Sequence, residues 1–240
     1  MQTVSVILPA AGKSRRFIES RKDQSADHFE QKKLFAEIDG QPTWYISAQR
    51  FLCRDDVRQL IVVLSPEDRE EFTARYAELL AAQNILLVDG GKERSDSVAA
   101  GLAQVDPSVD LVCVHDAARP LVTQDRIDAV IAAASVSGAA MLATPIVGTV
   151  KRSLADRPEI DCTVDRTDLW EAQTPQVFDR SLLIDAYQHR AEFQATDDAL
   201  LFERLGRPVT LIEGSRRNLK ITTEEDLETA RLLYPLTVNS

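Results

Sequence analysis

Short apolar runs alternate with amphipathic stretches along most of the chain, and each run has the length of a buried strand. The runs are bounded by Pro, Gly, Asp or Asn, and most are rich in β-branched residues. Continuous apolar runs are typical of strands that are covered on both faces. We therefore expect strands at 4–8, 59–65, 84–88, 110–114, 138–145 and 208–212.

Helical patterns fill the intervals between these runs. One helix is expected to begin at Ser65-Pro66-Glu67, where a capping residue precedes a proline and an acid. Alternating strands and helices predict an α/β fold with a Rossmann-like doubly wound, mostly parallel sheet, in a single domain spanning 1–240. Ligands of such sheets bind beyond the carboxyl ends of the strands. The other helices are expected at 43–52, 94–105, 125–134, 181–189, 197–205 and 223–233.

Two segments depart from this alternation. Residues 147–169 are polar, contain glycine, proline and several acids, and sustain neither a helical nor a strand period. We interpret them as an excursion from the main domain, in the form of an extended arm. Residues 17–31 carry mixed charge and few core residues, so we expect a mobile surface loop there.

The charge balance narrows the class of partner. The 240 residues carry a formal net charge of −10, which argues against a nucleic-acid or membrane-surface binder. The three cysteines form no CxxC pair and the three histidines have no metal-ligand spacing, so no zinc site is expected. No apolar run approaches the roughly 20 residues of a membrane span. The first run enters a glycine turn and leaves no room for a signal peptide, so we expect a cytoplasmic protein.

Small residues follow two of the predicted strands. Residues 9–16 read PAAGKSRR, where small side chains let backbone amides approach a phosphate and two arginines bring positive charge to the same turn. Gly90 and Gly91 follow the third strand, and Ser97 falls in the first turn of the next helix. Taken alone, either segment also fits a simple turn that binds nothing.

Two charged residues follow later strands. Asp116 ends a buried strand, where a carboxylate without a partner would be costly. Its partner is either a magnesium ion that bridges to a triphosphate or Arg119 in a structural ion pair. Lys220 lies between two apolar residues just before the capping Thr223, so it points either toward the sheet end or into solvent.

Together these segments, in this order, resemble the 2-C-methyl-D-erythritol 4-phosphate cytidylyltransferase family of isoprenoid precursor synthesis. The resemblance covers nearly the whole chain and is most specific in HDAARP and QTPQ. It implies an enzyme that transfers CMP from CTP to 2-C-methyl-D-erythritol 4-phosphate, releasing pyrophosphate. The motifs are ILPAAG at 7–12, VDGGKERSDSV at 88–98, VHDAARP at 114–120, TVDRTDLWEAQTPQVF at 163–178, TDDA at 196–199 and NLKIT at 218–222.

The resemblance also implies roles for individual residues. Those that hold the cytosine and ribose are Ala10, Ala11, Gly12, Gly91 and Ser97. Those that contact the triphosphate and act in catalysis are Arg16, Lys33 and Lys220, with Asp116 as the Mg²⁺ ligand. Those that bind the methylerythritol phosphate are Arg119, Thr149, Arg166, Thr174 and Thr196.

The family resemblance further implies a homodimer formed through the 147–169 arm, with Arg166 reaching into the partner's site. The chain departs from the family pattern at two residues of the first loop. Ser14 stands where a second glycine is usual, and Lys32 stands where a proline usually precedes the loop lysine. The loop between Arg16 and Lys33 is also longer than is usual in the family.

The implied chemistry is attack by the acceptor's phosphate oxygen on the α-phosphorus of CTP. A phosphate monoester has a second pKa near 6 and is already largely dianionic at neutral pH, so no general base is needed. Catalysis would rest on positioning and charge stabilisation.

Three alternatives remain open. A ribitol-5-phosphate cytidylyltransferase usually reads HDAVRP and ETPQ, so Ala118 and Gln173 favour methylerythritol phosphate. A sugar-1-phosphate nucleotidylyltransferase normally has a longer glycine-rich first turn. A non-catalytic nucleotide-binding module would not need to keep all four charged residues, which are Lys33, Asp116, Arg119 and Lys220.

Overall fold

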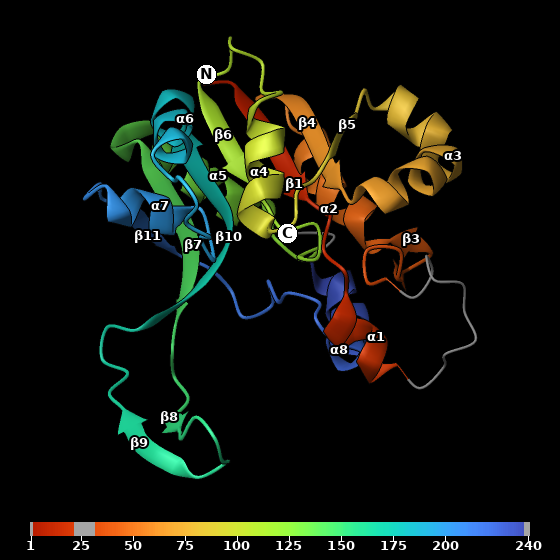
Figure 1. The fold of residues 1–240 in the computed structure, drawn as a ribbon. Helices are drawn as coiled ribbons and strands as arrows, with labels where there is room; N and C mark the ends of the chain where they lie inside the picture. Colours follow the sequence, from red (N-terminus) through yellow and green to blue (C-terminus); the bar gives the residue numbers. More distant parts are fainter. Residues whose placement is uncertain (1, 22–31, 238–240) are drawn as a thin grey trace.

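A seven-stranded mixed sheet forms the centre of the molecule (Figure 1). The computed structural model describes residues 2–21 and 32–237. Neighbouring strands run in the order β11-β7-β10-β6-β1-β4-β5, and β10 is antiparallel to both of its neighbours, whereas the other pairs are parallel. The strands are β1 (Val4–Pro9), β4 (Val57–Leu64), β5 (Leu86–Asp89), β6 (Leu111–Val114), β7 (Ala139–Pro145), β10 (Trp170–Asp179) and β11 (Thr210–Glu213).

Successive residues of the central strands enter two different cores, as the side-chain alternation of a strand requires. In β1, Val6 and Leu8 join one apolar cluster, and Ile7 joins the other. Because both faces are covered, the strand reads as one continuous apolar run, which confirms the predicted α/β fold with a mostly parallel sheet.

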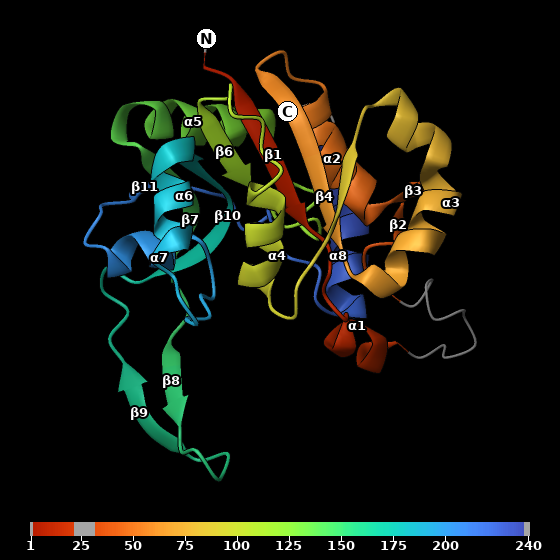
Figure 2. The ribbon, with the colours of Figure 1, turned by 45° about the horizontal axis from the view of Figure 1, so that its top comes forward.

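Helices cover both faces of the sheet, as Figure 2 shows from a second direction. One face packs against α2 (Thr43–Leu52), α3 (Pro66–Ala82) and α5 (Gln124–Ser137). The other packs against α4 (Arg94–Leu102), α6 (Arg180–Gln188) and α7 (Ala199–Arg204). Each of these helices, and every strand expected from the sequence, lies within a few residues of its predicted position.

A third apolar cluster closes the carboxyl end of the sheet. It joins α1 (Arg15–Ser20) to α8 (Glu224–Leu233), which lie side by side in both views (Figures 1 and 2). Phe17 is fully buried there, so the prediction of a surface loop beginning at residue 17 is wrong at its start. The Phe17 side chain anchors the short helix α1 to the core. The mixture of positive and negative residues in this segment does not reveal the helix. Residues 22–31 of the predicted loop lie outside the described residues. The remaining short elements are β2 (Glu37–Ile38), β3 (Gln41–Pro42) and the 3₁₀ turn η1 (Tyr234–Leu236).

The predicted excursion is an arm that extends away from the sheet (Figure 1). It contains an antiparallel hairpin of β8 (Val150–Ser153) and β9 (Ile160–Val164), although no strand was expected there. Nearly every residue of the hairpin is at least partly exposed, so no apolar alternation marks it in the sequence. The prediction also missed β10, which leads back from the arm and begins with exposed residues.

Lys32, the residue that replaces the usual proline, forms a buried ion pair. Its Nζ lies 2.5 Å from Asp68 Oδ1, and both side chains are almost inaccessible to solvent. Ser65 Oγ donates to the other oxygen of Asp68 at 2.6 Å. The pair therefore ties the segment before Lys33 to the first turn of α3.

This ion pair should contribute measurably to stability. Asp68→Asn leaves the buried Lys32 ammonium uncompensated, so it should lower the free energy of unfolding by about 3–5 kcal/mol in urea denaturation. Asp89→Asn is the matched control, because it breaks the exposed pair with Arg69, whose atoms lie 2.8 Å apart, and exposed pairs contribute at most about 1 kcal/mol. Equal losses in the two variants would contradict the structural role of the Lys32–Asp68 pair.

Candidate functional site

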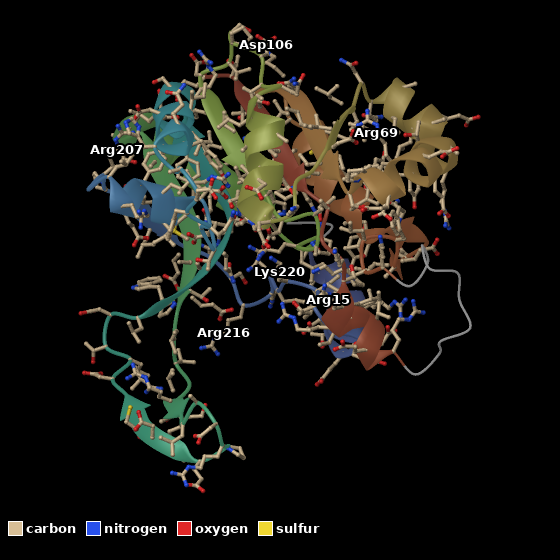
Figure 3. All side chains as sticks on the ribbon, in the orientation of Figure 1. Arg15, Arg69, Asp106, Arg207, Arg216 and Lys220 are labelled. Carbon is tan, nitrogen blue, oxygen red and sulfur yellow. The ribbon has the colours of Figure 1, made fainter. Side chains whose placement is uncertain are left out.

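A cavity of about 770 Å³ opens beyond the carboxyl end of β7 and the amino end of the antiparallel β10, beside the loop that follows β11. Four cationic side chains line it, against the acids Glu171 and Asp226. Figure 3 shows two of the four, Arg216 and Lys220, near the point where the arm leaves the sheet. The cationic residues are Arg16, Arg119, Arg216 and Lys220. The balance of charge in the lining suits an anionic ligand.

Asp116 follows β6 and is surrounded by three cations. Its Oδ2 lies 2.8 Å from Lys220 Nζ and 3.4 Å from Arg119 Nε, and its Oδ1 lies 3.5 Å from Arg94 Nε. Burial alone would raise the pKa of this carboxyl group, but attraction to Lys220, Arg94 and Arg119 together holds the pKa far below its ordinary range. The carboxylate is therefore ionised at neutral pH, and both Arg119 and Lys220 are its structural partners.

Arg94 connects Asp116 to a second buried acid. Its Nη2 lies 2.9 Å from Asp198 Oδ2, and Asp198 Oδ1 accepts a hydrogen bond from the Tyr187 hydroxyl at 2.5 Å. Burial lowers the pKa of Arg94, but Asp198 and Asp116 outweigh it and raise that pKa. Sequence reasoning missed Arg94 and Asp198, although both stand inside motifs it had singled out. No local pattern marks either residue, because their ion pair joins two segments that lie far apart in the sequence.

Thr174 and His115 fix the backbone at Asp116. The amide of Asp116 donates to Thr174 Oγ1 at 2.9 Å, and Thr174 Oγ1 lies 3.2 Å from His115 Nδ1. His115 Nε2 lies 3.0 Å from the Arg119 carbonyl oxygen, which can only accept, so Nε2 carries the proton and Nδ1 accepts from the threonine. Burial lowers the pKa of His115 to about 4, which keeps the ring neutral. Thr174, predicted as a substrate contact, thus also positions Asp116.

The loop that carries Lys220 is held by the part of β10 where its pairing with β7 is interrupted, between Ala172 and Gln176. Asn218 Nδ2 donates to the Thr174 carbonyl at 2.9 Å, and Gln173 Nε2 donates to the Ser215 carbonyl at 2.9 Å. The carbonyl of Asn218 accepts from Arg119 Nη1 at 2.7 Å. Gly214 permits this approach, since a Cβ there would come within 2.4 Å of Gln173 Oε1. Lys220 is therefore fixed relative to Asp116 before any ligand arrives.

Lys33 lies within the electrostatic field of the same cluster. Burial, followed by repulsion from Lys220, lowers its pKa to about 8, with Arg16 also lowering it and Asp116 opposing. The three residues predicted to act in catalysis, Arg16, Lys33 and Lys220, are thus brought together although they are far apart in the sequence.

The small-residue turns after β1 and β5 pack against each other. A Cβ at Gly90 would lie 2.7 Å from Ala11 Cβ and 2.8 Å from Ser97 Oγ, so only glycine fits there. Ser14 adopts a left-handed conformation with φ 52°, which explains why a glycine is usual at this position. The two predicted nucleotide-binding segments therefore form one surface.

Of the five predicted substrate contacts, Arg119 lines the cavity and the other four do not. Thr174 is buried within β10. Thr149 and Arg166 are exposed and lie at the two ends of the arm, and Thr196 is exposed in the turn before α7. Within the described part of the chain, none of them lines the cavity.

Residues 2–21 and 32–237 contain no group of three or more His, Cys, Asp or Glu side chains that could hold a metal ion. In the same residues, no helix is both long and apolar enough to cross a membrane.

Comparisons with known proteins agree on one family. The model of the IspD family, described as 2-C-methyl-D-erythritol 4-phosphate cytidylyltransferase, matches residues 4–234. The enzyme of that name from Rhodopirellula baltica is 45% identical over 242 residues, covering 96% of this chain and 94% of that protein. The enzyme of that name from Caldanaerobacter subterraneus is 38% identical, with 95% and 97% covered. The crystal structure of the Thermus thermophilus enzyme of that name superimposes with a TM-score of 0.77 at 30% identity, covering 98% of this chain and 100% of that one.

The Asp116 cluster makes a prediction about stability and pH. Asp116→Asn leaves buried cations without their acid, so it should lower the free energy of unfolding at pH 7 by about 3–5 kcal/mol. An acid whose pKa is depressed on folding stabilises above its unfolded pKa of about 3.9, and the contribution is lost as pH falls. The difference in the free energy of unfolding between the wild type and Asp116→Asn should therefore become smaller by about 1.4 kcal/mol for each pH unit below pH 4.

Urea denaturation between pH 7 and pH 3 measures this difference. Asp156→Asn, at an exposed position of the arm, serves as the control and should change little at any pH. A difference for Asp116→Asn that does not vary with pH would show that the carboxylate charge is not what stabilises the cluster.

Proposed function

Since this chain belongs to the IspD family of 2-C-methyl-D-erythritol 4-phosphate cytidylyltransferases, we propose that the cavity beside Asp116 is where it joins its two substrates. The enzyme is a cytidylyltransferase of the non-mevalonate route to isoprenoids. It transfers CMP from CTP to 2-C-methyl-D-erythritol 4-phosphate and forms 4-diphosphocytidyl-2-C-methyl-D-erythritol.

The observation that carries the proposal is that Arg16 and Lys220 line one cavity, and that Lys33 lies close enough for the charges of both to lower its pKa. The acceptor phosphate attacks the α-phosphorus, a P–O bond forms, and the bond to the leaving pyrophosphate breaks. Charge accumulates on the α-phosphate oxygens in this step, and fixed cations stabilise it without reorganising. No proton has to be removed, because the acceptor phosphate is already largely dianionic.

The nucleotide would bind along the surface formed by the turns after β1 and β5. Ala10, Ala11 and Gly12 follow β1, and Gly91 and Ser97 follow β5. Gly90 packs closely on Ala11 and Ser97, so no side chain at residue 90 blocks the approach of a base or a ribose to the backbone there. Arg16 and Lys33 then stand where the triphosphate would extend.

Asp116 is the residue that would hold Mg²⁺. It is a single buried carboxylate, and Mg²⁺ sites commonly take one or two carboxylates and complete their shell with waters and substrate phosphates. The three surrounding cations weaken the attraction of a free metal ion, so this donor set fits a metal that arrives with CTP. When bound, the metal would neutralise charge on the phosphates.

The arm would pair two copies of the chain. Its apolar side chains Val147, Ile160, Leu169 and Trp170 are between 38% and 65% exposed, although such residues are normally covered. A second copy would cover them and would bring Arg166 of one chain to the cavity of the other. This accounts for an arginine that resembles a substrate contact but does not line the cavity of its own chain.

The pKa of Lys33 predicts a pH limit for the reaction. With a pKa of about 8, this lysine loses its charge as pH rises through 8, so kcat/KM for CTP should fall above that pH. Lys33→Arg keeps the charge and should remove the decline up to about pH 10. Lys13→Arg, on the exposed turn, should leave the profile as in the wild type. If kcat/KM for CTP in the wild type stays constant up to pH 9.5, the charge of Lys33 is not needed for the reaction.

A subunit-mixing experiment tests the shared site. Lys220→Ala should lower turnover by about 10²-fold or more, as losing one preorganised donor does. Arg166→Ala should raise the KM for methylerythritol phosphate much more than that for CTP. In a mixed dimer, one site combines the intact Lys220 of one chain with the intact Arg166 of the other, and the second site carries both defects.

Random mixing makes about half the dimers of this kind, so the mixture should recover up to about a quarter of wild-type activity. Each variant mixed with itself is the control. Absence of recovery in samples shown to exchange subunits would rule out the shared site.

A further inference from the structure

Arg216 is a cation on the cavity wall that none of the roles above uses. Its side chain is exposed and lines the cavity together with Arg16 and Lys220. Figure 3 shows it extending from the loop after β11, on the arm side of Lys220. Within the described residues it makes no hydrogen bond and no ion pair. All five of its N–H donors are therefore available to a ligand.

The other cations on that side of the cavity are already engaged. Arg119 is only 7% exposed, and it bonds to the Asn218 carbonyl and lies beside Asp116. Lys220 forms its ion pair with Asp116 at 2.8 Å. An anionic group that enters here would find in Arg216 the guanidinium whose donors are not committed to the protein.

The loop holds Arg216 in a defined place. The Asn218 amide donates to the Ser215 carbonyl at 3.0 Å, and the Arg217 amide donates to Ser215 Oγ at 3.1 Å, so residues 215–218 form a turn. The Gly214 amide donates to the Ala143 carbonyl at 2.8 Å and anchors the turn to β7. Because the backbone is fixed, binding has to order only the side chain of Arg216.

The order of the strands in the sheet indicates which of the two anionic substrates, CTP or the acceptor, lies closer to Arg216. The nucleotide turns follow β1 and β5, on one side of β6, whereas Arg216 follows β11, at the opposite edge of the sheet. Arg16, the other wall cation that has no partner among the described residues, is on the nucleotide side. We propose that Arg216 binds the phosphate of the acceptor, 2-C-methyl-D-erythritol 4-phosphate, in the cavity of its own chain. The inference rests on the proposal that this cavity is the site of transfer.

The neighbouring Arg217 supplies a matched control. It is equally exposed and carries the same charge, but it does not line the cavity. Loss of a charge-assisted hydrogen bond should make Arg216→Ala raise the KM for the acceptor by about 10- to 100-fold and leave the KM for CTP within about twofold. Arg216→Lys keeps the positive charge but lacks the paired N–H donors of a guanidinium. The KM of this variant for the acceptor should therefore lie between those of the wild type and Arg216→Ala. Arg217→Ala should match the wild type in both constants.

The outcomes separate this inference from the proposal on which it rests. An acceptor KM that is the same in Arg216→Ala and Arg217→Ala overturns the inference, as does an equal rise in the KM for CTP. Lys220→Ala is measured in the same series. Loss of turnover in Lys220→Ala together with an unchanged Arg216→Ala rejects only the role of Arg216. Normal turnover in Lys220→Ala rejects the cavity as the site of transfer.

Discussion

The burial of one carboxylate, that of Asp116, is the constraint around which this site is built. An ion removed from water costs several kcal/mol unless charged partners surround it. Here the partners come from three separate segments: Arg94 from the start of α4, Arg119 from the loop after β6, and Lys220 from the loop after β11. Because each must reach the same two oxygen atoms, the carboxylate fixes the relative positions of segments that lie far apart in the sequence. The second acid, Asp198, continues the same network through Arg94 into α7.

Hydrogen bonds between uncharged groups also hold the segments of the site in place. Thr174 and Asn218 bind backbone groups across the site, and the neutral His115 leaves a ring nitrogen free to accept from Thr174. The cations are thus assembled before any ligand is bound, which is the arrangement that electrostatic catalysis requires. Assembly has a cost that is visible at Lys33, where burial and repulsion from Lys220 lower the pKa to about 8. Asp116 limits this cost by offsetting part of the positive charge without removing it from the cavity.

The sequence predicted the parts of the fold that are governed by burial. The strands covered on both faces, such as β1 and β4, read as apolar runs, and the helices between them read as amphipathic. The hairpin of β8 and β9 was missed because none of its strand residues is buried, and α1 was missed because Phe17 is its one buried residue. At the site, Asp116 and Lys220 were found from their motifs, whereas Arg94 and Asp198 were not. Their significance lies in a contact across 104 residues of sequence (198 minus 94), and no local pattern encodes such a contact.

Some cations of the site are paired with Asp116 and others have no partner among the described residues, and this division fits the chemistry of joining two anions. A triphosphate and a phosphate monoester repel each other, so the enzyme has to hold both while their reacting atoms approach. Arg119 and Lys220 are held by their ion pairs with Asp116 and can serve the point where the two substrates meet. Exposed cations without partners among the described residues stand on either side, Arg16 beyond β1 and Arg216 beyond β11. Each can follow the outer phosphate of one substrate without disturbing the central cluster, because neither is needed to neutralise Asp116. The same separation gives a physical reason for an arm. If two copies pair through the arm as proposed, Arg166 of the second copy would supply a further cation for the acceptor without having to be buried next to Lys33 and Lys220 in its own chain.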